Sequence, residues 1–392
     1  MNSLAIASVR TFATLPERAA QSVAVQQFAK ARRKRQDVHR VYGWGLAASG
    51  ALGVREFINP QHHNARLRAT AKPCRVPFAD KYRVTDIACG YGFSLFVVKG
   101  SNCLFGAGLN TCGQLGFHPS KDDMSRTRQW LIDPTPIELP LNDALNARVI
   151  GVCCGRTHSL VATSEGLFAF GSNAQGQCGR PIISNEDYTR TATVSKVAQL
   201  PDGGLIRQVV AGLDHSLVLF DDGTVFSFGL GADGQLGNGS YQSCWQPQLV
   251  EGEIKGERIV QLASAGDTVL AVSDNGDLFG WGNSEYKQLV TDQAQQAVPK
   301  CLPFRVGKVT CAAAGGSACA LINDQGELYV WGYGLLGQGP EVTVRSAPSL
   351  IPMPIFGQSA MCEDVHVKHV CASLLHFCCS YFRTRAIHVG QE

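Results

Sequence analysis

Short apolar runs alternate with polar turn segments along most of this 392-residue chain, and residues 206–240 show the pattern most clearly. Two runs, RQVVAG and HSLVLF, are rich in β-branched and apolar side chains, and a third, TVFSF, follows the dipeptide Asp222-Gly223. Such runs predict strands, and Asp-Gly between two of them is typical of a tight hairpin turn. The polar segment ADGQLGNG then ends the unit. We therefore predict an antiparallel meander of three short strands here.

Similar units recur from residue 41 to residue 377, and they align on the glycine that closes the third strand of each unit. The six aligned glycines are Gly45, Gly108, Gly171, Gly229, Gly282 and Gly332. A second glycine follows five residues later in every unit except one, where Lys287 stands instead, and several units continue as GQLG or a variant of it. A single meander has an apolar face that it cannot bury alone. The repeat therefore predicts a stacked or radial array of sheets.

The length of the unit favours the radial arrangement. Successive closing glycines lie 50 to 63 residues apart, which is typical of four-stranded propeller blades, whereas solenoid repeats are shorter or helical. Proline-bearing segments between the units supply the fourth strand, because proline is tolerated on an outer edge strand. These segments are KPCRVPF, PTPIEL, VPKCLPF and APSLIPM. We predict an all-β fold, a β-propeller over residues 41–377, with the proline-bearing strands at its rim.

The motifs resemble those of the regulator of chromosome condensation repeat family. Blades of that family carry a Cys/Ala-Gly-x-x-His strand, an Asp-Gly hairpin, and a Trp-Gly strand followed by GQLG. The tryptophan is kept at Trp44, Trp281 and Trp331. The basic start of the chain, the opening VYGWGLAASGALGV and the phrase VWGYGLLGQGP are most similar to the mitochondrial branch of the family, a branch of G-exchanging factors. The resemblance implies a propeller of the same type over roughly residues 41–377.

The C-terminus departs from the family pattern. The resemblance implies seven blades, closed when the strand at residues 41–45 completes a sheet begun near the C-terminus, yet only six repeats are countable. Residues 378–392 lack an Asp-Gly turn, GQLG and a rim proline, so we interpret them as a divergent C-terminal tail. Either the ring is a blade short, which we favour, or residues 381–389 are a diverged third strand. A ring left open would expose unpaired strand edges.

The first 36 residues carry seven Lys and Arg against a single acid, Glu17. An acid-poor, arginine-bearing amphipathic leader is typical of a mitochondrial presequence, so we predict a mitochondrial targeting leader over residues 1–36. The alternative is that KARRKR, at residues 30–35, serves as a nuclear import patch. Under the first hypothesis the protein is located in the mitochondrial matrix or at the inner membrane.

Charge and composition narrow the class of partner. The leader contributes a net +6 to the formal charge of +3, which leaves the propeller near −3. A body that binds bare nucleic acid would usually have a pI above about 9, so protein partners are favoured. No apolar run is long enough for a membrane helix, and any membrane association would be peripheral.

Motifs for metals, cofactors and covalent catalysis are missing from the sequence. Fifteen cysteines include no C-x-x-C pair, and we interpret them as small buried side chains rather than metal ligands. Two G-x-G-x-x-G segments, at 229–234 and 332–337, occupy the repeat turn and lack the following helix that a dinucleotide site needs. We therefore predict no metal, no cofactor and no covalent catalysis.

The candidate site is the loop that follows the first strand of each unit, because propellers place binding functions on variable loops held by rigid strands. The predicted partner-binding residues are Asp214, His215, Arg156, His158, Asp267 and Phe93. His158 and His215 share one repeat position, so a structural hydrogen bond within the blade is the competing interpretation. Asp214 breaks the repeat and is the stronger candidate.

The resemblance adds a role for this face. In the founding member of the family it grips a small GTPase and expels the nucleotide, using an aspartate that Asp214 matches. Arg156-Thr157-His158 stands where the founder has a further aspartate, and SNAQGQCG at 172–179 is an ordinary turn where a wedge hairpin is expected. Exchange needs only that the factor bind the empty GTPase better than the loaded one, so no acid–base pair is required.

The sequence thus predicts a mitochondrial interaction propeller with the character of a guanine-nucleotide exchange factor. The resemblance implies two kinds of partner: a dynamin-like fusion GTPase of the mitochondrial inner membrane, and the pseudouridylation and ribosome assembly factors of the mitochondrion, with ribosomal RNA possibly contacted indirectly. The alternatives are a nuclear, chromatin-associated exchange factor for a small GTPase and a purely structural scaffold.

Overall fold

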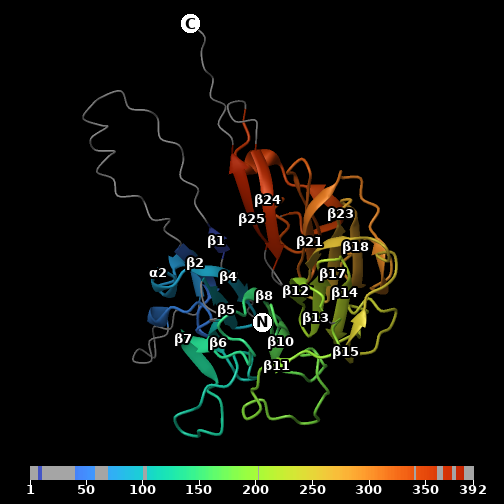
Figure 1. Cartoon of the computed structure of the whole chain (residues 1–392). Helices are drawn as coiled ribbons and strands as arrows, with labels where there is room; N and C mark the ends of the chain where they lie inside the picture. Colours follow the sequence, from blue (N-terminus) through green and yellow to red (C-terminus); the bar gives the residue numbers. More distant parts are fainter. Residues whose placement is uncertain are drawn as a thin grey trace, which may run out of the picture.

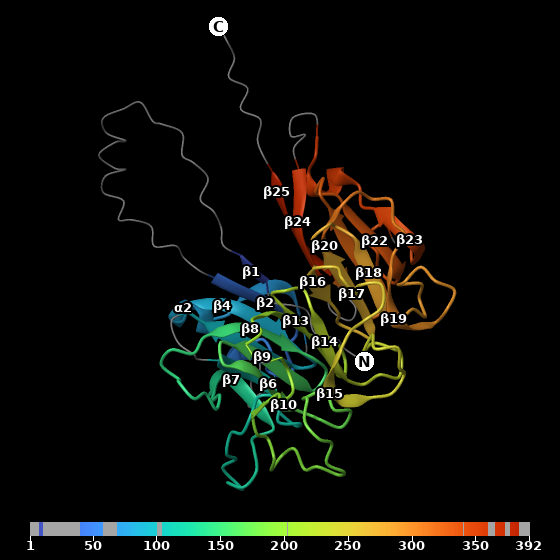
Figure 2. The ribbon, with the colours of Figure 1, turned by 45° about the vertical axis from the view of Figure 1, so that its right-hand side comes forward.

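The computed structural model describes residues 8–10, 40–57, 69–99, 104–201, 203–339, 341–359, 365–372 and 377–383. These residues form seven sheets, of which five have four strands, one has three and one has two. Figures 1 and 2 show the sheets arranged in chain order around a common centre. Among the residues so described, helix is limited to one four-residue α-helix, α2 (Phe78–Lys81), and two 3-10 turns, η1 (Arg55–Phe57) and η2 (Met353–Phe356).

The five complete blades follow one another without a break in sequence order. The first blade consists of β4 (Val84–Cys89), β5 (Phe93–Val98), β6 (Leu104–Leu109) and β7 (Trp130–Ile137). The second consists of β8 (Val149–Cys154), β9 (His158–Thr163), β10 (Gly166–Gly171) and β11 (Ser195–Lys196). The third consists of β12 (Ile206–Ala211), β13 (His215–Phe220), β14 (Val225–Gly229) and β15 (Cys244–Leu249).

The fourth blade consists of β16 (Ile259–Ala263), β17 (Thr268–Ser273), β18 (Leu278–Asn283) and β19 (Gln295–Cys301). The fifth consists of β20 (Val309–Ala314), β21 (Ala318–Asn323), β22 (Leu328–Tyr333) and β23 (Val344–Leu350). Every neighbouring pair within a blade is antiparallel, so each blade is a simple meander. The all-β propeller predicted from the repeat is confirmed.

The second strand of each blade forms the core. All six residues of β5, β9, β13, β17 and β21 are buried. These strands read as almost continuous apolar runs because neighbouring blades cover both of their faces. The outer strands lie at the rim, where most of β23 is exposed. The proline-bearing segments do supply these outer strands, as β7 and β19 show.

Each GQLG turn forms a contact with the next blade around the ring. The side-chain oxygen of its glutamine accepts a hydrogen bond from the backbone of its own turn, as Gln235 Oε1 does from Asp233 N at 2.8 Å. This bond orients the side-chain amide toward the first loop of the following blade. Gln177 Nε2 lies 3.5 Å from Asp214 Oδ1, Gln235 Nε2 lies 3.2 Å from Asp267 Oδ1, and Gln288 Nε2 lies 3.2 Å from Gly316 O.

The backbone carbonyl of the same glutamine also accepts a hydrogen bond from the next blade. The donor is either a tryptophan indole or a serine hydroxyl. Trp281 and Trp331 donate their indole N–H to the carbonyls of Gln235 and Gln288, at 3.0 and 2.7 Å. Where phenylalanine replaces the tryptophan, a serine on the paired strand donates instead. Ser159 Oγ reaches Gln114 O and Ser216 Oγ reaches Gln177 O, both at 2.7 Å. The buried carbonyl therefore keeps a donor in all four contacts, as burial requires.

The two ends of the chain form the remaining sheets. The N-terminal sheet contains β1 (Ser8–Arg10), β2 (Arg40–Leu46) and β3 (Ala69–Arg75), and the C-terminal one is a hairpin of β24 (Val365–Ala372) and β25 (Phe377–Arg383). The hairpin packs on β20 and β21 and, in both views, lies between the fifth blade and the N-terminal sheet (Figures 1 and 2). Six sheets of three or four strands therefore serve as blades, and the hairpin adds two more strands.

The hairpin includes the first residues of the predicted C-terminal tail. Strand β25 crosses the position, after Phe377, where the repeat pattern ends, and Tyr381 pairs with Val367 within it. Residues 381–383 thus belong to the second strand of a hairpin, while residues 384–392 lie outside the described part of the chain. Of the predicted leader, Ser8–Arg10 pairs with β2, and the rest of residues 1–36 lies outside the described part.

The closing glycine of the third strand can be tested by substitution. Gly332 has a φ of 100°, and an added Cβ would come within 2.4 Å of the Ser317 carbonyl oxygen. We expect Gly332→Ala to lower the free energy of unfolding by about 3 kcal/mol, because it adds a backbone clash to the left-handed conformation. Gly256→Ala is the control, since its φ is 89° but nothing lies within 4 Å of the added Cβ. Equal losses in urea denaturation would contradict the packing role.

Candidate functional site

The candidate site is built on one repeated register position. The first residue of each second strand pairs with the closing glycine of the third strand. The five pairs are Phe93 with Gly108, His158 with Gly171, His215 with Gly229, Thr268 with Gly282 and Ala318 with Gly332. The residues just before these positions form the loops between first and second strands, and those loops lie at one end of the ring.

Neighbouring loops are joined to each other. Arg156 N donates to Leu213 O at 2.9 Å, and Leu213 N donates to Gly266 O at 3.3 Å. The glutamine amides described above reach the same loops from the preceding blades. We call the loops at residues 90–92, 155–157, 212–214, 265–267 and 315–317 the collar. Side chains on the collar are held by backbone contacts on both sides, so they form a preorganised surface.

Arg156 and Asp214 form an ion pair across two blades of the collar. The Arg156 guanidinium contacts the Asp214 carboxylate, which also lies near the Gln177 amide. Asp214 is buried, whereas about half of the Arg156 side chain, 52%, is exposed. Burial raises the pKa of Asp214 above its ordinary value, and the charge of Arg156 opposes that rise. The pair therefore places a buried carboxyl group just beneath a half-exposed guanidinium.

Asp267 provides a second carboxylate one blade further round the collar. Gln235 Nε2 donates to its Oδ1 at 3.2 Å, and His215 Nδ1 lies 3.7 Å away, too far for a hydrogen bond. Burial alone would raise the pKa of Asp267, but its interactions with His215, Gln235 and Arg156 outweigh that effect and lower the pKa. Arg156 is the cation common to both carboxylates, so the collar carries more negative than positive charge here.

The two histidines and Phe93 lie beneath the collar. All three are completely buried. Their rings pack under the first glycine of each loop, which we call the anchor glycine. A Cβ on Gly90, Gly155 or Gly212 would lie 2.2, 2.2 and 2.0 Å from the ring beneath it. The structure therefore places these predicted site residues in supporting positions, out of reach of a partner. Asp214, Asp267 and Arg156 are the predicted residues that it brings together.

The histidines act as hydrogen-bond partners between blades. His158 Nε2 lies 3.1 Å from Ser216 Oγ, and His215 Nε2 lies 3.4 Å from Ser264 Oγ. Burial, reinforced by the charges of His215 and Arg156, lowers the pKa of His158 to about 3. His158 is therefore neutral at physiological pH and does not act as a pH switch there. This geometry agrees with the structural interpretation of the two histidines.

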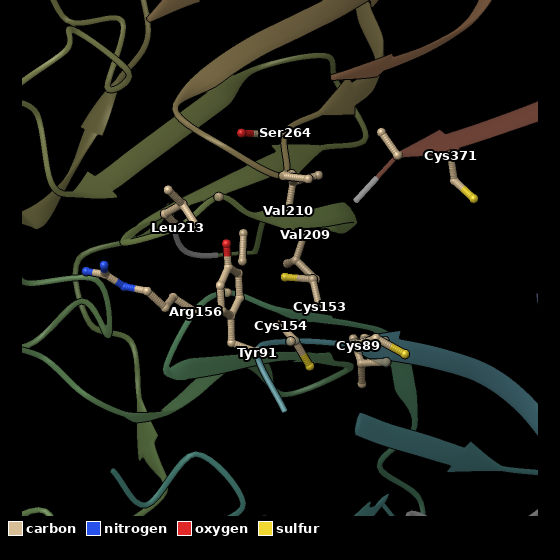
Figure 3. Close-up of a pocket in the computed structure, with 18 of the residues that line it drawn as sticks. Cys89, Tyr91, Cys153, Cys154, Arg156, Val209, Val210, Leu213, Ser264 and Cys371 are labelled. Carbon is tan, nitrogen blue, oxygen red and sulfur yellow. The ribbon is translucent and has the colours of Figure 1, made fainter. Parts of the chain in front are cut away.

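A cavity of about 230 Å³ opens at the centre of the ring below the collar. Strands β4, β8 and β12 line it with apolar and thiol side chains, and Cys371 of β24 closes one side. In the view of Figure 3 the ring of Tyr91 is seen between the side chains of Arg156 and Cys153. Burial raises the pKa of the Cys153 and Cys154 thiols well above the ordinary value, so both remain protonated.

Three contributors to the site were not among the predicted site residues: Tyr91, Gln177 and Gln235. Tyr91 is one position beyond an anchor glycine, and burial raises the pKa of its hydroxyl while the charge of Arg156 opposes that rise. Gln177 and Gln235 were visible in the sequence as GQCG and GQLG, but only as turn markers. Their reach to the carboxylates of the next blade depends on the ring, so no local pattern could have assigned it.

Comparisons with known proteins agree with this architecture. The model of the RCC1-like domain matches residues 35–379. The chain belongs to the RCC1-like domain family.

Within this family, the chain is similar to the human RCC1-like G exchanging factor-like protein, with 43% identity over 91% of this chain and 78% of the relative. The crystal structure of human WBSCR16 superimposes with a TM-score of 0.81 and 41% identity, covering 87% of each chain. Yeast Prp20p, studied for its binding to Gsp1p and histones, has a TM-score of 0.69 over 89% of this chain and 79% of its own. At 20% identity, the last comparison shows the fold alone.

The described part of this RCC1-like propeller contains no candidate cluster of metal-binding side chains and no candidate membrane-spanning helix. No three His, Cys, Asp or Glu side chains among the described residues are placed to hold a metal ion. None of the helices in that part is long and apolar enough to cross a membrane.

Replacing Arg156 tests the electrostatics of the collar. Without Arg156, the pKa of buried Asp214 should rise further above its unfolded value. A carboxyl with a raised folded pKa destabilises the folded state at pH values above its unfolded pKa, and the cost disappears once both states are protonated. We expect Arg156→Gln to cost about 1–2 kcal/mol at pH 7, which lies between the values for an exposed and a fully buried pair because Arg156 is half exposed.

The pH dependence identifies the cause of that loss. In thermal melts, the deficit of Arg156→Gln relative to the unmodified protein should shrink as the pH falls toward about 4. Adding Asp214→Asn should restore most of the stability at pH 7, because the unpaired buried charge is gone. A deficit that is the same at every pH, or that the second substitution does not relieve, would contradict the ion-pair interpretation.

Proposed function

We propose that this RCC1-like propeller is a mitochondrial interaction protein that acts as a guanine-nucleotide exchange factor through its collar. The observation that carries the proposal is the cluster of Asp214, Asp267 and Arg156 at the rigid end of the ring. Two carboxylates share one exposed cation there, so the surface is suited to a partner that presents a positive group. Exchange of this kind involves no covalent step.

The mechanism rests on differential binding. A factor accelerates nucleotide release when it binds the empty GTPase more tightly than the loaded one, because binding energy then offsets the loss of the nucleotide. The half-exposed Arg156 side chain can turn away while Asp214 stays in place, held by its burial and by Gln177. A lysine or arginine of the partner would then replace Arg156 as the cation beside Asp214.

The proposed GTPase is the dynamin-like fusion GTPase of the mitochondrial inner membrane, and the membrane association is peripheral. The similarity to the human RCC1-like G exchanging factor-like protein supports an exchange role. The leader at residues 1–36, with seven cations and one acid, supports the mitochondrial location.

A second candidate function is a scaffold in mitochondrial ribosome assembly, working with pseudouridylation factors. The near-neutral to acidic propeller favours it as a protein-binding scaffold, with ribosomal RNA contacted only through those proteins. The two functions make different demands on Asp214. Exchange requires the carboxylate at the collar, whereas a scaffold can use any exposed face.

Nucleotide-release kinetics test the exchange function. We expect the protein to accelerate release of a fluorescent guanine nucleotide from the purified fusion GTPase, and Asp214→Ala to reduce that acceleration by at least about tenfold, since each 1.4 kcal/mol of lost binding is a factor of ten. Asp274→Ala is the matched control, because Asp274 is an exposed carboxylate at the opposite end of the ring.

The outcomes separate the two functions. If the unmodified protein does not accelerate release, the exchange function is wrong. Co-migration with pre-ribosomal particles in a sucrose gradient would then support the scaffold. If Asp274→Ala slows release as much as Asp214→Ala does, the collar is not the site of exchange.

The leader gives an independent prediction about location. We expect the mature protein to begin between about residues 20 and 40, because import peptidases remove such leaders. N-terminal sequencing of protein isolated from cells measures this directly. An intact Met1 on a nuclear pool of the protein would instead favour the alternative in which KARRKR directs nuclear import.

A further inference from the structure

One turn on the collar side of the ring has an unusual composition for its conformation. In the fourth blade, SEYKQLV at residues 284–290 replaces both glycines of the GQLG turn with Lys287 and Val290. Their φ angles are 64° and 54°, close to the 78° and 64° of Gly234 and Gly237 in the third blade. The hydrogen bonds of the turn are also kept, with Lys287 N on Ser284 O and Val290 N on Lys287 O.

This turn therefore carries backbone strain that the other turns avoid. Left-handed backbone is unfavourable for side chains with a Cβ, and most so for a β-branched one. Among the described residues with positive φ, Val290 is the one that is β-branched. Burial does not compensate, because 37% of Val290 is exposed and Lys287 is also partly exposed. Strain that the fold does not need is a reason to look for a function.

The strained turn presents an aromatic surface. Tyr286 stacks on Tyr333 of the next blade, with ring centroids 5.2 Å apart and planes at 20°. Both tyrosines are well exposed, and Leu335, two residues further on, is 84% exposed. Tyr333 N donates to the collar residue Ser317, so this surface and the collar are on the same side of the ring. We call Tyr286, Tyr333 and Leu335 the tyrosine platform.

The charges of the strained turn and of the turn before it are mostly negative, while Arg345 lies on β23 beside Tyr333. Glu285 is exposed beside Tyr286, and Asp292 is fully exposed. Lys287 Nζ lies 2.9 Å from Asp292 Oδ1, so the one cation in this turn is already paired. Asp233 of the preceding turn accepts from Asn283 and Gln295 and adds a further negative charge. A phosphate backbone would be repelled here, whereas a cation would be attracted.

We propose that the tyrosine platform is a docking site for an arginine-bearing segment of a protein partner. A guanidinium stacks well on tyrosine faces, and the exposed carboxylate of Glu285 can pair with it at the edge. Leu335 receives the apolar part of the same segment. Rigid, exposed tyrosines are typical of the residues that dominate protein interfaces. The inference rests on the proposed function in one respect: the partner is the GTPase that engages the collar.

The first experiment measures affinity for the nucleotide-free fusion GTPase by biolayer interferometry. We expect Tyr286→Ala, Tyr333→Ala and Leu335→Ala each to weaken binding about tenfold or more, because each removes part of a central contact. Leu145→Ala is the matched control for Leu335→Ala: Leu145 is 95% exposed in the segment at residues 142–146, which is bonded to Glu165 at the other end of the ring. Unchanged affinity in the platform variants would overturn the proposal.

The second experiment separates this inference from the exchange function. If the unmodified protein does not bind the GTPase, the proposed function fails, and a defined peptide then tests the platform. The probe is a twelve-residue peptide of alternating arginine and leucine, with a version carrying glutamate for arginine as the control. We expect the tyrosine NMR signals of the unmodified protein to shift with the arginine peptide alone, and Tyr286→Ala to abolish binding. Equal responses to both peptides would overturn the proposal.

The strain itself can be measured without any partner. Restoring the repeat with Lys287→Gly and Val290→Gly should raise the Tm, because glycine adopts the left-handed conformation without a steric cost. The far-UV spectrum should be unchanged. A fall in Tm would show that the two side chains stabilise the turn, and the reason for assigning it a function would be lost.

Discussion

The contact on which this propeller depends is the one that each GQLG glutamine makes with the next blade. A blade alone is a four-stranded meander with two apolar faces, and it is stable only between neighbours. The glutamine joins the neighbours with directional bonds: its carbonyl takes a hydrogen bond from Trp281 or from a serine such as Ser216, and its amide reaches the following loop. Because these groups are buried, losing one partner would leave an unsatisfied polar group, which costs more than the bond itself contributes.

The same contact explains the position of the candidate site. The side-chain amides of Gln177 and Gln235 reach Asp214 and Asp267. The groups that connect neighbouring blades therefore also hold the acidic residues of the site. The collar is therefore rigid, and a partner meets carboxylates that are already oriented. This arrangement suits a protein that works by binding one state of its partner better than another, since no ordering energy is spent on the site. The tyrosine platform lies on the same side of the ring, on the fourth and fifth blades.

The ends of the chain show what happens where the repeat is interrupted. The hairpin of β24 and β25 packs on the fifth blade, but β25 pairs only with β24 among the described residues. Strand β2 pairs instead with Ser8–Arg10 and β3. The two sheets thus stand next to each other in the ring without a shared ladder. The apolar residues of the hairpin, Val365, Val367 and Val370, pack with the core of the fifth blade. The backbone pairing found within the complete blades does not bridge the hairpin and the N-terminal sheet.

The sequence by itself determined the all-β class, the blade repeat, the proline-bearing rim strands and the side of the ring on which Asp214, Asp267 and Arg156 lie. These follow from local rules: strand periodicity, hairpin dipeptides and glycines at left-handed positions. Only the tertiary structure decided which blades touch. It paired Arg156 with Asp214, 58 residues away, stacked Tyr286 on Tyr333, and buried Phe93, His158 and His215 under anchor glycines. Repeat spacing makes such positions equivalent along the chain, but exposure and pairing depend on the ring, which no single repeat contains.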